Sequence, residues 1–248
     1  PQVVRGIIAR SGRRPEDYLS LVRLDPQWRC LYEDGTRIDL LEDVGRMAAA
    51  MDRQFPGRGA GEGWRRFIDW SRRMYRLSDK VFFYKDLGAI VDLMRKPPAN
   101  DPGLLGDVLA MRMHSTVART VHKWIEEPHL RQLSEHFLQY VGSSPFLSPS
   151  ILGLIASAQV DHGCWYSMGG TRQVARSLER SRREERAELL TGSGVKRIVQ
   201  RGGVAVGVEL EDGRSLEADL VVSNCDVQRP YRDLLGDGPS LREQGAIA

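Results

Sequence analysis

The sequence predicts a mixed α/β (α+β) fold, because the spacing of its apolar residues changes twice along the chain. Apolar and polar residues alternate over 23–40, apolar residues recur every three or four positions over 41–141, and short β-type runs return after 188. With 248 residues, 41% of them hydrophobic, the chain is long enough to bury one large core or two smaller ones. We therefore expect a helical portion between two portions that contain strands.

The first strand-type segment, 23–40, reads as a β-hairpin. Trp28, Cys30 and Tyr32 alternate with polar residues, and the alternation resumes from Thr36 to Leu40. Between these two runs, Glu33-Asp34-Gly35 supplies a residue that accepts positive φ, as a tight hairpin turn requires.

The helical segment 41–141 contains a basic amphipathic stretch at 64–82. Its apolar residues fall at helical spacing, and arginines stand between them. A helix packed on a core has this pattern, and so does a helix that lies on a membrane surface, so the sequence leaves both interpretations open. The apolar residues are Trp64, Phe67, Ile68, Met74, Tyr75, Val81 and Phe82, and the arginines are Arg65, Arg66, Arg72, Arg73 and Arg76.

Further helices follow a break. Three prolines within 96–103 interrupt the helical pattern, which resumes over 104–125 and again over 130–140. The composition of 142–145 indicates a loop, and 149–158 is apolar enough for a short helix or turn.

The last third has a different pattern. A short strand at 163–166, a glycine turn at 168–171 and a helix at 172–183 form what reads as the start of a βαβ unit. A β meander is expected beyond it, with turns at 202–203 and 211–213. Its strands are expected at 188–190, 195–200, 204–210, 215–216 and 220–223.

Composition and motifs argue against several classes of protein. The most apolar window, 104–125, carries charged residues and is not expected to span a membrane. The 31 Arg and 5 Lys are matched by 33 acidic residues along the whole chain, so we do not expect nucleic acid as a partner. The three cysteines are far apart in the sequence, which favours reduced thiols in a cytoplasm. No export signal is visible at the start of the sequence.

Motifs for metal binding and hydrolysis are not seen. The five histidines lack a metal-binding spacing, so no metal site is expected, and no G-x-S-x-G motif indicates a hydrolase. Gly169-Gly170-Thr171 stands where a strand leads into a helix, so its backbone N–H groups could face an anion. A tight turn that needs two residues without Cβ explains the same sequence, and the G-x-G-x-x-G fingerprint is absent.

Four separated segments together resemble the bacterial-type phytoene desaturases, which are FAD-dependent carotenoid desaturases related to the amine oxidases. The resemblance extends from about Gly12 to Leu235, in the order of the family. The segments are Leu24-Asp25-Pro26 to Glu33-Asp34-Gly35, Tyr140-Val141-Gly142-Ser143-Ser144-Pro145-Phe146, Gly163-Cys164-Trp165-Tyr166-Ser167-Met168-Gly169-Gly170-Thr171, and Ala218-Asp219-Leu220-Val221-Val222-Ser223-Asn224-Cys225-Asp226.

The resemblance implies a flavoprotein of two interleaved domains with FAD as cofactor. It assigns 1–166 to a substrate-binding domain with a helical lid, and 167–248 to part of the FAD-binding domain. By this resemblance, the cofactor-binding residues are Gly169, Gly170, Thr171, Val195 and Asn224.

The sequence departs from that family at both ends. The family's opening dinucleotide-binding βαβ unit and its closing glycine-rich FAD segment are not found here, so the resemblance predicts an internal fragment. Because the pyrophosphate site belongs to the opening unit, we expect this chain alone to bind FAD weakly or not at all.

The implied activity is desaturation of a carotenoid precursor such as phytoene, by hydride transfer to flavin. A long apolar isoprenoid requires an apolar tunnel, and an enzyme that takes it from lipid is expected to be cytoplasmic and peripheral to a membrane, with 64–82 as the contact. No catalytic acid or base is identified. Another isoprenoid or retinoid substrate, in a saturase or a squalene-related oxidoreductase, and a cofactor-free lipid-binding module remain open alternatives. The tunnel candidates are Phe137, Tyr140, Phe146, Ile151, Leu154 and Trp165, although the same side chains are more typical of plain core than of a ligand contact.

Overall fold

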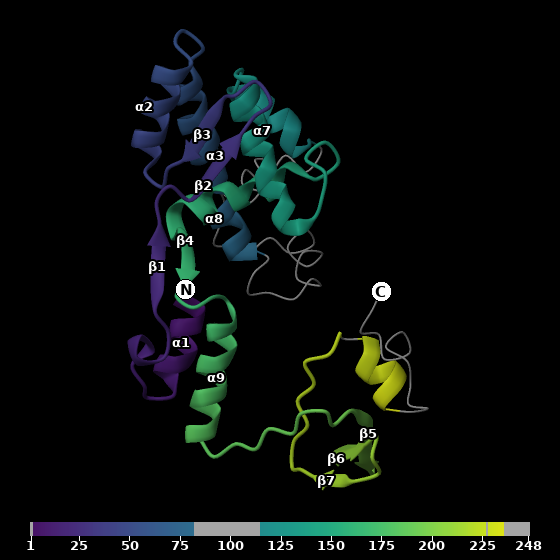
Figure 1. Cartoon of the computed structure of the whole chain (residues 1–248). Coiled ribbons are helices and arrows are strands. Elements are labelled where there is room, and N and C mark those ends of the chain that lie inside the picture. Colours follow the sequence, from purple (N-terminus) through teal and green to yellow (C-terminus); the bar gives the residue numbers. More distant parts are fainter. Residues whose placement is uncertain (1, 82–114, 227, 236–248) are drawn as a thin grey trace, which may run out of the picture. The chain divides into compact units, whose positions relative to one another are not determined.

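The computed structural model describes residues 2–81, 115–226 and 228–235 (Figure 1). The chain divides into two compact units, Pro1–Arg180 and Ser181–Ala248. The break predicted at 96–103 and most of the helix predicted at 104–125 lie outside the described residues. The assignment of 1–166 to substrate and 167–248 to FAD concerns function and stays a prediction.

The first unit combines helices with two small antiparallel sheets. The helical pattern predicted over 41–141 is confirmed where the structure describes it, and the short helix or turn predicted at 149–158 is helical and continues to His162. The elements, in chain order, are α1 (Gln2–Arg10), η1 (Pro15–Asp17), β1 (Leu21–Leu24), β2 (Trp28–Leu31), β3 (Arg37–Leu40), α2 (Val44–Gln54), α3 (Ala60–Val81), α6 (Val117–Trp124), α7 (Pro128–His136), η2 (Phe137–Val141), η3 (Ser150–Gly153), α8 (Leu154–His162), β4 (Cys164–Ser167) and α9 (Arg172–Glu184).

The predicted hairpin forms, but it is shorter than 23–40. Strands β2 and β3 pair from Trp28↔Leu40 to Leu31↔Arg37, and Gly35 supplies the expected positive φ of 82° in the turn. Arg23 and Leu24, at the start of the predicted hairpin, belong to β1, which pairs with β4 and not with the hairpin. A partner about 140 residues away leaves no signal in the local alternation, so the hairpin start was predicted too early.

The core of this unit is built on the apolar face of α3. Trp64, Phe67 and Ile68 have no exposed surface and pack among side chains of the hairpin, α2, α6, α7 and α8. Of the two interpretations of 64–82, the structure therefore agrees with a helix that packs on a core. Met74 and Leu77, further along the same face of α3, are also buried, and membrane contact through 64–82 stays a prediction.

Strand β4 and helix α9 do not begin a βαβ unit, which corrects the sequence prediction. Strand β4 pairs antiparallel with β1, whereas the next strand along the chain, β5, belongs to a different sheet. Helix α9 packs near η1, where the Arg180 guanidinium lies 4.3 Å from the centre of the Tyr18 ring and donates to the Asp17 carbonyl at 3.0 Å. All strand pairs in the described residues are antiparallel.

The second unit is a three-stranded antiparallel meander of β5 (Val195–Arg201), β6 (Val204–Leu210) and β7 (Ser215–Glu217), followed by the helical turn η4 (Pro230–Leu234). These strands agree with the prediction. Strands β6 and β7 approach closely at Gly207, where a Cβ would lie 2.2 Å from the Leu216 carbonyl oxygen.

Two of the predicted short strands are wrong. Residues 188–190 and 220–223 form no strand, although both runs contain apolar side chains. In the linker 185–194, which joins α9 to β5, nearly every residue is exposed, including Leu189 and Leu190. Exposed leucines in an open segment look the same in sequence as the leucines of a short strand.

The structure also bears on the predictions about membrane-spanning helices and cysteines. Within 2–81, 115–226 and 228–235, no helix has the length and apolar character needed to cross a bilayer. Cys30, Cys164 and Cys225 are all free thiols.

Candidate cofactor and substrate site

The predicted glycine turn forms a corner between β4 and α9. Gly169 and Gly170 have φ values of 83° and 89°, and the Gly170 N–H donates to the Ser167 carbonyl at 2.8 Å. Thr171 is the last residue before the helix, and the first bonds of the turn, Gln173 N–H to Gly170 and Val174 N–H to Thr171, are 3.0 Å long. Residues with a Cβ rarely adopt these φ values, so the two glycines are required for the chain to turn here.

The corner is open on its outer side. A Cβ at Gly170 would have no neighbour within 4 Å, and Gly169 and Thr171 are exposed. In the described part of the chain, the N–H groups of Gly169 and Thr171 have no backbone acceptor, and the buried hydroxyl of Ser167 has no hydrogen-bond partner. Open space beside unpaired donors suits the polar edge of a cofactor.

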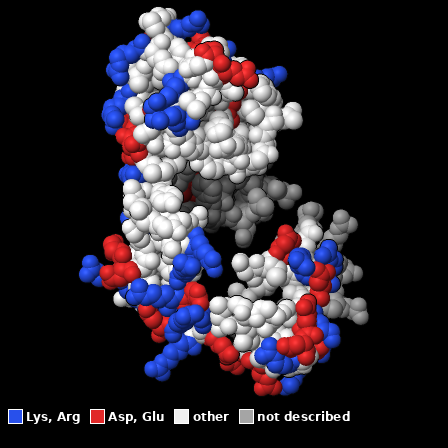
Figure 2. Space-filling model, in the orientation of Figure 1, with Lys and Arg blue, Asp and Glu red and all other residues white. Residues whose placement is uncertain are grey.

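Strands β1 and β4 carry an exposed apolar face next to this corner. Val22 pairs with Tyr166 and Leu24 with Cys164, so these four side chains lie on the same face of the ribbon. Val22, Leu24, Tyr166 and Met168 are 45%, 36%, 49% and 51% exposed. We call this set, together with Cys164, the apolar strip. Figure 2 shows a largely uncharged surface over β1 and β4, between regions where basic and acidic residues are interspersed.

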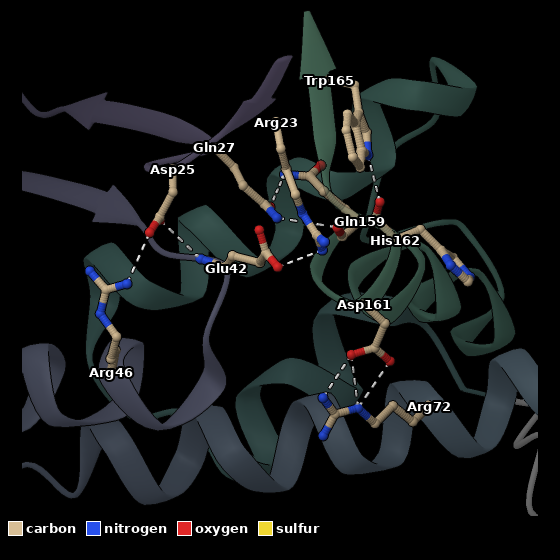
Figure 3. A network of polar contacts seen from close by, with 10 residues as sticks. All are labelled: Arg23, Asp25, Gln27, Glu42, Arg46, Arg72, Gln159, Asp161, His162 and Trp165. Carbon is tan, nitrogen blue, oxygen red and sulfur yellow. Dashed lines mark hydrogen bonds and ion pairs between the residues drawn. The ribbon is translucent and has the colours of Figure 1, made fainter. Parts of the chain in front are cut away.

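The opposite face of the ribbon is covered by charged groups. The Arg23 and Arg5 guanidinium groups lie 5.4 Å and 5.3 Å from the centre of the Trp165 ring, and Arg23 also pairs with Glu42. The Trp165 indole N–H donates to the His162 carbonyl at 2.8 Å (Figure 3). Trp165, one of the predicted tunnel residues, thus lies on the other side of the ribbon from the apolar strip.

Tyr140 lies at the Cys164 end of the apolar strip. Its hydroxyl donates to Gln159 Oε1 at 2.8 Å, and its ring stacks on Trp28 with 5.8 Å between ring centres. Burial, together with the neighbouring Cys164, raises the pKa of Tyr140 to about 12. Burial also raises the pKa of the Cys164 thiol, so both groups are neutral at physiological pH.

The Tyr140 contact continues into a buried pair of amides. Gln159 Nε2 donates to Gln27 Oε1 at 3.0 Å, and Gln27 Nε2 donates back to the Gln159 carbonyl at 3.3 Å (Figure 3). Both glutamines are buried, so each amide depends on the other for its hydrogen bonds. This network fixes the position of the Tyr140 hydroxyl at the end of the strip.

The other predicted tunnel residues do not line the apolar strip. Phe137 is fully buried in the main core, and Ile151 is buried in a second cluster with Met74 and Leu77, against which Leu154 packs. Phe146 is exposed. In this conformation only Tyr140, of the six, adjoins the apolar strip.

The two remaining predicted cofactor residues lie in the second unit. Val195 is the first residue of β5 and is partly exposed, and Asn224 is exposed in the segment after β7. Sequence reasoning missed the β1 side of the strip. The apolar residues at 21, 22 and 24 could have indicated a strand, but nothing in the local sequence identifies the strand with which it pairs.

Comparison with protein families matches residues 14–238 to the flavin-containing amine oxidoreductases. The chain belongs to this family, whose cofactor is FAD, and the resemblance inferred from the four segments is confirmed at this level.

The chain is also similar to individual proteins. The chain is 30% identical over 235 residues to 4,4'-diapolycopene oxygenase of Methylomonas sp, which covers 95% of this chain and 46% of that protein. It is also 30% identical over 235 residues to 4,4'-diaponeurosporene oxygenase of Staphylococcus haemolyticus (strain JCSC1435), covering 95% and 45%. The chain thus spans about half the length of the curated relatives it matches.

Proposed function

We propose that this chain supplies the substrate-binding part and a portion of the FAD-binding part of an oxidoreductase that acts on a long apolar isoprenoid of the carotenoid type. The supporting observation is the apolar strip, which begins at Met168, directly beside the Gly169-Gly170 corner. An exposed apolar surface that adjoins an open backbone corner can hold a hydrocarbon chain against a cofactor edge.

The chemistry depends on FAD, which when bound supplies the two-electron acceptor that amino-acid side chains cannot provide. The apolar strip would orient the chain and exclude water from it. Gly169, Gly170 and Thr171 would face the cofactor at the corner, whereas Val195 and Asn224 are assigned to the cofactor by the family resemblance alone. We assign no catalytic acid or base.

Two reactions fit this arrangement. Desaturation of a precursor such as phytoene would remove two hydrogens from neighbouring carbons and form a double bond, and bound FAD would supply the two-electron acceptor. The names of the relatives favour the second, oxidation of a carotenoid by an oxygenase. Both reactions use the same apolar chain, so the strip supports the substrate class and not the choice between them.

The substrate assignment can be tested by binding. All-trans-retinol, an isoprenoid polyene, should quench the tryptophan fluorescence of the purified chain, because Trp28 and Trp165 lie close to the ribbon. Val22→Glu and Tyr166→Glu place a charge on the open face and should weaken binding at least about tenfold. Leu147→Glu, at an exposed leucine elsewhere, is the matched control and should bind as the wild type does. Equal binding by all four proteins would refute the assignment.

The cofactor assignment needs its own titration. FAD added to the purified chain should bind weakly, and Gly170→Val should abolish that binding, because valine disfavours the φ of 89° and fills the open corner. Tight stoichiometric binding with a shifted flavin spectrum would contradict the expected weakness. Retinol binding with no response to FAD at any concentration would favour a cofactor-free lipid-binding module.

A further inference from the structure

We infer that Tyr140 determines specificity by recognising a hydroxyl group on the bound isoprenoid. The inference rests on the proposed function, because it assumes that a hydrocarbon chain lies along the apolar strip. It adds that, among the apolar chains that the strip can hold, one that carries an alcohol at the end remote from the glycine corner binds most tightly.

The position of Tyr140 supports this. Met168 and Cys164 are four residues apart along the direction of β4, which corresponds to about 13 Å in a strand. The Tyr140 hydroxyl donates at 2.8 Å to Gln159, near the end of the helix that leads into β4 at Cys164, so it lies at the far end of the strip from the corner. A chain held with one part at the corner and extended along the strip would bring its other end to this hydroxyl.

The hydrogen bonds around Tyr140 determine what it can recognise. Its O–H is donated to Gln159, whose amide is held in turn by Gln27. A phenolic oxygen that has used its proton can still accept hydrogen bonds, and the Cys164 thiol is only a weak donor. The Tyr140 oxygen can therefore accept a hydrogen bond, and the ligand group that pairs with it must be a hydrogen-bond donor.

Tyr140 is more exposed than an ordinary core tyrosine. Tyr140 is 55% exposed, whereas Gln27 and Gln159 behind it are 4% and 6% exposed. The two buried amides join the segment before β2 to α8, and they also hold the hydroxyl of a half-exposed residue in place. Such support is expected where a polar group must keep one orientation toward a ligand.

The test compares two probes that differ in one proton donor. All-trans-retinol carries a terminal hydroxyl, and its methyl ether has the same polyene chain without the O–H. Quenching of tryptophan fluorescence gives the affinity of the 248-residue chain for each. We expect the wild type to bind retinol about fivefold more tightly than the ether, as one neutral hydrogen bond allows.

Two variants locate the source of that preference. Tyr140→Phe should bind retinol and the ether equally, with ether affinity unchanged from the wild type. Tyr231→Phe removes a tyrosine hydroxyl in η4, outside the apolar strip, and should keep the fivefold preference. Circular dichroism melting confirms that both variants are folded.

The outcomes distinguish the two proposals. If neither probe binds the wild type, the apolar strip does not hold an isoprenoid, and the proposed function fails together with this inference. If both probes bind equally to the wild type, or if Tyr140→Phe retains the preference, the inference alone is overturned.

Discussion

Arg72 of α3 and Asp161 of α8 form a two-point ion pair. Arg72 Nη2 lies 2.7 Å from Asp161 Oδ1, and Arg72 Nε lies 3.0 Å from Asp161 Oδ2 (Figure 3). The pair joins α3 to the helix that leads into β4, and it raises the pKa of Arg72. Both side chains are about one-third exposed, so water weakens the attraction between them.

Asp161→Asn should lower the free energy of unfolding by about 0.5–1 kcal/mol, because it removes the charge while keeping the shape. Urea denaturation at low and high salt measures this, and the difference from wild type should shrink at high salt. Asp69→Asn is the control, because Asp69 is more exposed and makes a single 3.3 Å contact with Arg72. An equal loss in both variants would contradict a special role for the two-point pair.

The same geometry determines how membrane contact should be tested. Reversing Arg72 to Glu would break its pair with Asp161, so lost lipid binding could reflect lost structure. Arg76→Glu and Arg65→Glu, at exposed positions on the outer face of α3, avoid this pair. If α3 attracts anionic lipid, the double variant should pellet less with phosphatidylserine vesicles than the wild type does. Unchanged pelleting would exclude this face as the contact.

Trp64 provides a test of the core. It is fully buried, and its indole N–H has no hydrogen-bond partner among the described residues. Trp64→Ala should cost about 3–5 kcal/mol of stability. Trp64→Phe should cost much less, because the smaller ring also removes an unsatisfied donor. Equal losses in denaturant unfolding would show that the N–H is satisfied in the folded protein.

Gly207→Ala should disrupt the meander, because its Cβ would collide with the Leu216 carbonyl 2.2 Å away. We expect a loss of about 2 kcal/mol or more, the size typical of backbone strain combined with a lost strand contact. Gly203→Ala is the matched control: its φ is also positive, but a Cβ there has open space. Hydrogen exchange of β6 and β7 amides should be faster in Gly207→Ala alone.

His129 makes the stability of the hairpin contacts depend on pH. Its Nδ1 lies 2.8 Å from Glu127 Oε1 and its Nε2 lies 3.0 Å from Asp34 Oδ2, in the hairpin turn, while Tyr32 and Phe55 pack against the ring. Glu127, helped by Asp34, raises the pKa of His129 above its ordinary value. The stabilisation is therefore complete below about pH 6.5 and is lost as the pH rises through the folded-state pKa.

Thermal melting from pH 5.5 to 8.5 should show this loss, and His129→Gln should remove it. His136 is the control, because burial lowers its pKa and gives the opposite sign. Its contribution is complete above about pH 6.5 and declines as the pH falls below that value. A His129→Gln protein that keeps the loss between pH 6.5 and 8.5 would contradict the assignment.

Local patterns predicted much of the fold. The turn at Gly35, the helix around Trp64 and the meander strands β5 and β6 depend on neighbouring residues, and the structure confirms them. The pairing of β1 with β4 depends on residues far apart in the chain, which periodicity does not reveal. For the same reason, the sequence placed β4 in a parallel unit with the meander.

Some features of the candidate site could also be predicted from local sequence, and others could not. The glycine corner was found from its two glycines at a strand-to-helix junction, and the structure confirms its positive φ values. The buried Gln27–Gln159 pair was not foreseen, because the two residues are 132 positions apart and glutamine is ordinarily a surface residue. Only tertiary contact distinguishes such a pair from two solvated side chains.

The open linker 185–194 has a practical use. Few of its side chains are buried, so its length can change without leaving a hole in either interior. A short tag or a fluorescent label inserted near Thr191 should therefore leave both units folded. The linker thus offers a place for a reporter that follows the meander by spectroscopy while the helical unit binds its ligands.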